Sequence, residues 1–200
     1  MVAVTMSIED ITGREAENLK RALRRRDPAA IDLLIDRYQY RLMRYLLSLA
    51  ENRSSAEDLF QETWIRVLEH GDQYDGRSNF EPWLFRIARN LVIDRLRRRK
   101  QLVSVEGLAE SLGLESSDGL MPAEHSSQLE HVERLETREN VAGALGQIPV
   151  AHREVLTLRF QEELSLEEIA GIVGAPLSTV KSRLYRGMEM LREKLEGLRP

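Results

Sequence analysis

The stretch SLEEIAGIVGAPLSTVKSRLYR, residues 165–186, predicts two short helices joined by a tight turn. Ser165 and Glu168 have the spacing of a capping box that opens the first helix. Gly174 suits a turn that needs a positive φ angle. Val180 begins an apolar stripe at helical spacing that continues through Leu184, Met188, Leu191 and Leu195. This is the pattern of a helix-turn-helix, whose second helix enters the major groove of DNA.

The second helix presents polar groups on the face opposite this stripe. On a wheel of about 100° per residue, Thr179, Ser182 and Arg186 point away from the stripe. Three further side chains flank that face, namely Lys181, Arg183 and Tyr185. Hydroxyl and guanidinium groups are the groups that contact base edges and phosphates. The alternative is a solvated face of a helix that closes a bundle.

The composition limits the kinds of protein that this chain can be. Of its 200 residues, 42% are hydrophobic and 31% are charged, so it can bury a core under a highly charged surface. It has no cysteine, which excludes disulfides and thiolate metal sites and fits a cytoplasmic location. We expect no membrane insertion, because no long apolar run is present and residues 1–10 lack the pattern of a signal peptide.

Charge is distributed unevenly along the chain. The total formal charge is −4, but residues 24–100 carry +4 and residues 101–137 carry −7. Residues 1–23 carry −1, and residues 138–200 are neutral. Within residues 84–100 there are seven basic side chains and one acid, Asp94. Such a local field attracts a polyanion.

The periodicity predicts an all-α protein. Asp27 and Pro28 mark the start of a helix that runs to about Ala50. A second helix is predicted from Ser55 to about His70, and a third from Ser78 or Asn79 to Lys100. In the C-terminal part, one helix ends before Pro149, one spans about 151–163, and the helix-turn-helix follows. Trp64 and Trp83 lie on apolar faces, where we expect core positions.

These helices group into two small domains. We expect an N-terminal extension at 1–23 without an assigned element, a helical domain at 24–100 and a second helical domain at 137–200. Between the two domains lies a flexible acidic linker at 101–136, rich in Ser, Gly and Glu. The linker either mimics a nucleic acid or acts as a solubilising spacer, and the sequence favours neither.

Three blocks in this order resemble the short extracytoplasmic-function (ECF) sigma factors of the sigma-70 family. They are AEDLFQETW at 56–64, FEPWLFRIARNLVIDRLRR at 80–98, and HREVLTLRF at 152–160 continuing through 165–189. The resemblance implies a promoter-recognition subunit of RNA polymerase that serves stress or envelope-response genes. The implied partners are core RNA polymerase, promoter DNA and an anti-sigma factor.

The resemblance implies a polymerase contact on the second helix. Asp58, Gln61 and Glu62 match the motif that docks on a coiled coil of the polymerase clamp. Their i, i+3 and i+4 spacing places them in one polar patch on a helix. Without this context, the same patch would be an ordinary solvated face.

The resemblance also implies two sites for promoter DNA. Asn90 matches the position that contacts a flipped-out base of the −10 element, with Arg86 one turn before it and Arg89 beside it. Tyr74, in the preceding loop, would stack on an unpaired base, although a partly exposed loop aromatic is the simpler interpretation. The arginines could equally form a solvated basic face. The −35 contacts are expected from Thr179, Lys181, Ser182, Arg183, Tyr185 and Arg186.

No pattern indicates catalysis, a metal or a cofactor. The four histidines lack metal-ligand spacing with carboxylates, and the sequence has no glycine-rich phosphate loop. We therefore expect a protein that is not an enzyme. Two other functions remain open: a stand-alone helix-turn-helix regulator that binds duplex DNA without polymerase, and a helical adaptor with no direct role on DNA.

Overall fold

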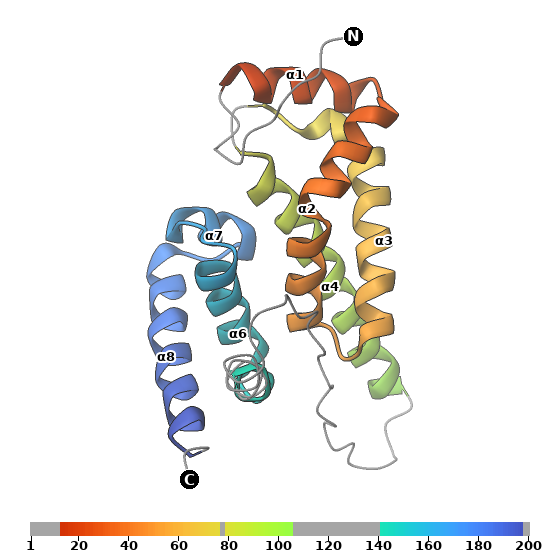
Figure 1. Cartoon of the computed structure of the whole chain (residues 1–200). Helices are drawn as coiled ribbons and strands as arrows, with labels where there is room; N and C mark the ends of the chain where they lie inside the picture. Colours follow the sequence, from red (N-terminus) through yellow and green to blue (C-terminus); the bar gives the residue numbers. More distant parts are fainter. Residues whose placement is uncertain (1–12, 77–78, 106–140, 198–200) are drawn as a thin grey trace, which may run out of the picture.

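The computed structural model describes residues 13–76, 79–105 and 141–197, and all the regular secondary structure in these ranges is helical (Figure 1). The first group of helices contains α1 (Gly13–Arg24), α2 (Pro28–Leu49), α3 (Arg53–His70), the 3₁₀ turn η1 (Gly71–Gln73) and α4 (Phe80–Val105). The second contains a helical segment at 141–146, α6 (Val150–Leu156), the π-helix η2 (Thr157–Gln161), α7 (Leu166–Val173) and α8 (Leu177–Glu196). The all-α prediction is confirmed, whereas the predicted acidic linker falls outside the described residues from 106 onward.

The start of α2 is the predicted one, and the start of α3 is not. Asp27 caps α2 by accepting a hydrogen bond from the amide of Ala29 at 3.1 Å. In α3 the cap is Asn52, whose Oδ1 accepts from the amide of Ser55 at 2.8 Å. The predicted start at Ser55 is therefore wrong by two residues, because an asparagine side chain satisfies a free helix amide as well as a serine does.

Two later helices also differ from their predicted bounds. The helix α4 continues beyond Lys100 to Val105, since the residues after the basic run include neither glycine nor proline. The helix predicted at 151–163 is shorter and mixed: α6 ends at Leu156, and its continuation η2 is a π-helix. Hydrophobic spacing does not distinguish these two helix types over a few residues.

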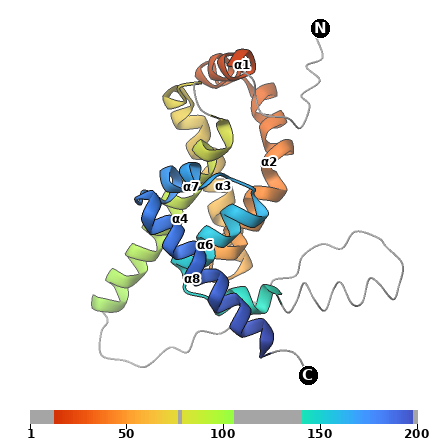
Figure 2. The same ribbon diagram turned by 90° about the vertical axis from the view of Figure 1, so that its left-hand side faces the viewer.

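The first described helix, α1, lies in the segment to which the sequence analysis assigned no element. Its buried residues, Ala16, Leu19 and Leu23, follow one another at helical spacing and face the rest of the first group. Figure 2 shows α1 at the end of the molecule, next to the loop that joins α3 to α4. Residues 13–24 are thus part of the packed structure rather than a separate extension.

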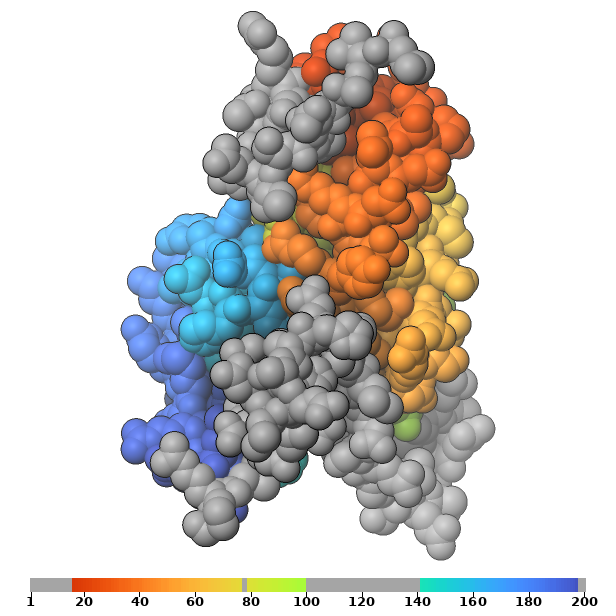
Figure 3. All heavy atoms as spheres, viewed as in Figure 1, coloured from red at the N-terminus to blue at the C-terminus, as the bar shows by residue number. Residues whose placement is uncertain are grey.

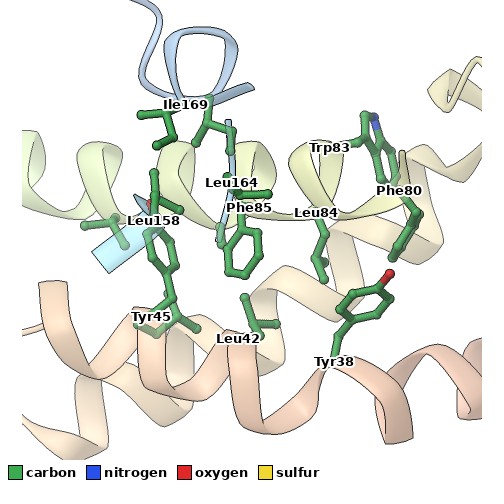
Figure 4. Close-up of a cluster of buried hydrophobic side chains, with 14 of the residues drawn as sticks. Tyr38, Leu42, Tyr45, Phe80, Trp83, Leu84, Phe85, Leu158, Leu164 and Ile169 are labelled. Atoms are coloured by element: carbon green, nitrogen blue, oxygen red, sulfur yellow. The ribbon is translucent and has the colours of Figure 1, made fainter. Parts of the chain in front are cut away.

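Both groups contribute to one continuous apolar core. Leu42, Leu46 and Leu84 are fully buried in the first group, and Trp64 and Trp83 are buried as predicted. In the close-up of Figure 4, Tyr45 of α2 and Phe85 of α4 lie near three side chains of the second group, which are Leu158, Leu164 and Ile169. In Figure 3 atoms of the second group lie directly against those of α2.

The helix-turn-helix has the predicted local geometry. Ser165 Oγ accepts from the amide of Glu168 at 3.2 Å, and Glu168 Oε2 accepts from the amide of Ser165 at 2.8 Å, which completes the capping box. Gly174 ends α7 with a φ of 60°. This left-handed conformation lets α8 turn away from α7 at little cost for a residue without a Cβ.

Candidate nucleic-acid and polymerase interfaces

The recognition helix α8 divides into a buried and an exposed face as its sequence predicts. Val180 and Leu184 are buried, and the missing side chain of Gly187 lets Leu156 of α6 approach, because a Cβ there would lie 3.1 Å from Leu156 Cδ1. Among the predicted −35 residues, Lys181, Ser182, Tyr185 and Arg186 are exposed, whereas Thr179 and Arg183 are half-buried.

A shallow hollow opens between α8 and the start of α6. Burial and the positive charges of Arg183 and Arg186 lower the pKa of His152 in this hollow. The surface is therefore electropositive and carries several hydroxyl groups, a combination suited to the backbone and base edges of DNA. The residues that line it are Ala151, His152, Ser178, Thr179, Ser182, Arg183 and Arg186.

The predicted −10 residues of α4 lie in two different environments. Arg86 and Asn90 are exposed and lie one turn apart on the same face. Arg89 is half-buried, and its Nε lies 3.0 Å from Glu154 Oε1 of α6. Arg86 and Asn90 are thus accessible to a ligand, while Arg89 is paired with Glu154 of the same chain.

Tyr74 is not the partly exposed loop residue that the sequence suggested. Its side chain is fully buried, with ring centroids 5.6 Å from Phe80 and 5.5 Å from Trp83. Burial, with a smaller effect from the charge of Asp75, raises its pKa to about 12. The expectation of an accessible aromatic is wrong, because the rings of Phe80 and Trp83 at the start of α4 pack against Tyr74 and cover it. Stacking on a base would require the loop to move.

The predicted polymerase patch lies on the outer face of α3. Asp58 and Gln61 are exposed, and Glu62 is half-buried. Asp58 Oδ2 lies 3.0 Å from Arg95 Nη2 of α4, and Glu62 Oε1 lies 3.1 Å from Arg66 Nε. Sequence reasoning missed two exposed apolar side chains further along α3, Ile65 and Leu68. Their spacing from Gln61, four and seven residues, was the available signal.

Sequence reasoning also missed a set of charges where the two groups of helices meet. Glu162 is completely buried and accepts from Arg41 Nε at 2.8 Å and from Arg44 Nη2 at 2.8 Å. Glu154 accepts from Arg89 and from the Tyr45 hydroxyl, each at 3.0 Å. Burial raises the pKa of the Glu154 carboxyl, although the Arg89 charge opposes this effect. These partners are 65 to 121 residues apart in sequence, so no local pattern signals them.

Neither a metal site nor a membrane span is found in the described part of the chain. Its His, Asp and Glu side chains form no group of three that could hold a metal ion. None of the described helices combines the length and the apolar character needed to cross a membrane.

Comparison with protein families identifies the two groups of helices. The model of Sigma-70 region 2 matches residues 34–101, and the model of Sigma-70, region 4 matches residues 138–191. The chain therefore belongs to the sigma-70 family of RNA polymerase sigma factors. The matched ranges include the polar patch of α3, α4 up to residue 101, and the helix-turn-helix up to residue 191.

Curated relatives narrow this class to the ECF group. The chain is 33% identical over 179 residues to the ECF RNA polymerase sigma factor SigW of Bacillus subtilis, which covers 86% of this chain and 92% of SigW. It is 32% identical to SigM of the same organism, over 81% of this chain and 93% of SigM. The chain is thus an ECF RNA polymerase sigma factor, as its sequence blocks indicated.

Solved structures show the same fold. The sigma factor RpoE of Bartonella quintana, in complex with the anti-sigma factor NepR, has a TM-score of 0.65 and 27% identity, covering 84% of this chain and 98% of RpoE. CnrH, in complex with the cytosolic domain of CnrY, has a TM-score of 0.64 and 21% identity, covering 95% of this chain and all of CnrH.

Proposed function

We propose that this sigma factor recognises promoters through two separate surfaces and binds core polymerase through a third. The observation that carries this proposal is the exposure of Arg86 and Asn90 on α4 together with Ser182 and Arg186 on α8, in one chain. An amide offers a donor and an acceptor to a base edge, and a guanidinium offers a paired donor to guanine.

On this proposal, α4 and the loop before it contact the −10 element and α8 contacts the −35 element. The polar patch of Asp58, Gln61 and Glu62 lies on α3 and binds the polymerase. The same proposal includes two domains, at residues 24–100 with α1 packed on it and at 137–200, and an acidic linker that follows the end of α4 at Val105. The chain acts in the cytoplasm as a specificity subunit, and the polymerase supplies the catalysis.

An anti-sigma factor is the proposed regulator. The sigma factor RpoE of Bartonella quintana, which has the same fold, is in a complex with the anti-sigma factor NepR. We propose that such a partner holds this chain inactive. We also propose that the chain serves genes for stress or the cell envelope.

Reconstitution with sigma-free core polymerase tests the proposal against its two rivals. Holoenzyme is assembled on a library of genomic DNA from the source organism, and the 5′ ends of transcripts are sequenced. A shared pair of motifs upstream of these ends supports the proposal and defines a promoter for later work. Tight binding to duplex DNA without core would instead indicate a stand-alone regulator. No transcript and no DNA binding would indicate an adaptor.

A further inference from the structure

The hollow between α6 and α8 contains a histidine that the expected −35 residues did not include. His152 lies near the start of α6 and packs on α8 at Gly187, where an added Cβ would lie 3.4 Å from the His152 Cβ. The imidazole shares the hollow with two arginines and three hydroxyl side chains of α8, which are Arg183, Arg186, Ser178, Thr179 and Ser182. The lining of the hollow therefore comes from α6 as well as from the recognition helix.

The two ring nitrogens of His152 differ in their surroundings. Nδ1 is buried and has no hydrogen-bond partner among the described residues. Nε2 is therefore the nitrogen through which the ring can bind a group in the hollow. A neutral imidazole has one N–H and a protonated imidazole has two, so protonation makes Nε2 a donor whichever tautomer precedes it.

The two arginines of the hollow have no anion opposite them. Within the described part of the chain, neither Arg183 nor Arg186 makes a hydrogen bond or an ion pair. Burial and these two positive charges hold the pKa of His152 below its ordinary value of 6.5, so the neutral ring predominates at pH 7. An anion in the hollow would pair with the free guanidiniums and remove the repulsion that keeps the ring neutral.

Other titratable groups close to α6 are bound to partners of their own. Glu154 accepts from Arg89 of α4 and from the Tyr45 hydroxyl of α2. Arg153, next to the histidine, and Arg159 of η2 donate to backbone carbonyls. Because this carboxylate is already engaged, an anion for the hollow has to come from a ligand.

We propose that a backbone phosphate of the −35 element binds in this hollow, between the imidazole of His152 and the guanidiniums of Arg183 and Arg186. His152 takes up a proton from the solvent as the phosphate binds, and Nε2 then donates to a phosphate oxygen. The inference rests on the proposed contact of α8 with the −35 element. Duplex DNA is the source of the phosphate, because the face of α8 that borders the hollow also exposes Ser182 and Arg186 to base edges.

The pH dependence of promoter binding tests this proposal. The complex holds one proton more than the free protein, so affinity should rise as the pH falls. Holoenzyme binding to the promoter fragment obtained above is followed by fluorescence anisotropy between pH 6 and pH 8. Relative to His152→Gln, we expect the parent to bind about threefold to tenfold more tightly at pH 6 than at pH 7.5. Parallel pH profiles for the parent and His152→Gln would overturn the proposal.

Two further variants separate the charge of His152 from its shape and from the other histidines. His152→Lys carries a permanent cation at the same position, so its affinity should stay high and lose the pH dependence of the parent. His70→Gln, at the end of α3, is the matched control and should retain the profile of the parent. A parent-like profile in His152→Lys, or loss of the profile in His70→Gln, would contradict the assignment to His152.

Salt dependence tests whether the ligand is a phosphate. At pH 6, His152→Gln should lower the slope of log Kd against log salt concentration by about one, since one contact to the DNA backbone is lost. The loss should be the same for promoters that differ at single −35 base pairs. An unchanged slope, or a loss confined to one base pair, would exclude the phosphate contact.

Calorimetry of the parent holoenzyme keeps the proposal testable if His152→Gln does not fold by circular dichroism. Binding to the same fragment is measured at pH 7 in buffers of different ionisation enthalpy, which gives the number of protons taken up. Net uptake is expected, and its absence would overturn the proposal. A parent that gives no promoter-dependent transcript would refute the proposed function, whereas normal transcription without proton uptake would refute only the role of His152.

Discussion

Gly71 lies directly against Leu23, so that the loop before α4 is held by a helix outside the matched region 2. A Cβ on Gly71 would lie 3.0 Å from Leu23 Cβ and 3.2 Å from the Leu23 carbonyl oxygen. Gly76, at the other end of the same loop, has a φ of 69° and approaches Lys20 of α1. The helix α1 thus fixes the path of the loop that buries Tyr74.

Gly71→Ala should destabilise the protein by about 1–3 kcal/mol, because the added methyl group meets backbone that cannot move away easily. The free energy of unfolding is measured by urea denaturation. Gly171→Ala is the matched control: apart from its chain neighbours and the backbone of its own helix, nothing lies within 4 Å of the added Cβ, and it should stabilise α7 by about 0.5–1 kcal/mol. Equal effects in the two variants would show that the contact with Leu23 is unimportant.

Alkaline pH should destabilise the fold through Tyr74. Its pKa is about 12 in the folded chain against an ordinary value near 10, so the unfolded chain loses this proton first. Below pH 10 the group has no effect on stability. Between pH 10 and 12 the free energy of unfolding should fall by about 1.4 kcal/mol per pH unit on account of this tyrosine.

Denaturation curves across this range compare the parent with Tyr74→Phe, which should show a shallower decline with pH. Tyr185→Phe is the control, because that side chain is exposed. Identical slopes for the parent and Tyr74→Phe would contradict the assignment.

Removing the cap of α7 should weaken the helix-turn-helix. Ser165→Ala eliminates the hydroxyl that accepts from the Glu168 amide and should cost about 1 kcal/mol of stability. Thermal or urea unfolding measures the loss. Ser54→Ala, at an exposed position of α3, should leave stability within about 0.5 kcal/mol of the parent. If Ser165→Ala left the stability unchanged, water would be satisfying the Glu168 amide in place of the hydroxyl.

Asn90→Ala should impair promoter opening while core binding is unchanged. The exposed amide of Asn90 is the proposed contact to an unpaired base, and it belongs to α4, whereas the proposed polymerase patch is on α3. Opening is followed by permanganate reactivity of the promoter, and core binding by fluorescence anisotropy. Gln61→Ala is the reciprocal variant, since it should weaken core binding. An equal loss of core binding in Asn90→Ala would exclude the proposed role.

Arg186→Ala should reduce discrimination at the −35 element by about 1–3 kcal/mol if the guanidinium makes a bidentate contact to a base. Binding of holoenzyme to promoters with single −35 substitutions measures this discrimination. Lys181→Ala provides the comparison. We expect Lys181 to contact a phosphate, and the loss of a phosphate contact weakens binding uniformly across sequences. A uniform loss in Arg186→Ala would reassign that side chain to the phosphate backbone.

Several features of this protein are evident in its sequence because they depend on neighbours a few residues away. The capping box of Ser165 and Glu168, the left-handed Gly174 and the exposed face of α8 follow from local spacing. The helix α1 was missed although its buried residues have helical spacing. Its apolar stripe of Ala16, Leu19 and Leu23 is short and lies among many charged residues, so the helical pattern is weak.

Only the tertiary structure decided which partners the buried charged groups and the aromatic rings contact. Tyr74 is buried because Phe80 and Trp83 are brought beside it by the turn between α3 and α4. Glu162 is buried because Arg41 and Arg44 approach it from a helix more than a hundred residues earlier. The sequence by itself determined the helices other than α1 and η2, the helix-turn-helix and the family. The pairing of the two regions depends on long-range contacts, whose partners share no local pattern.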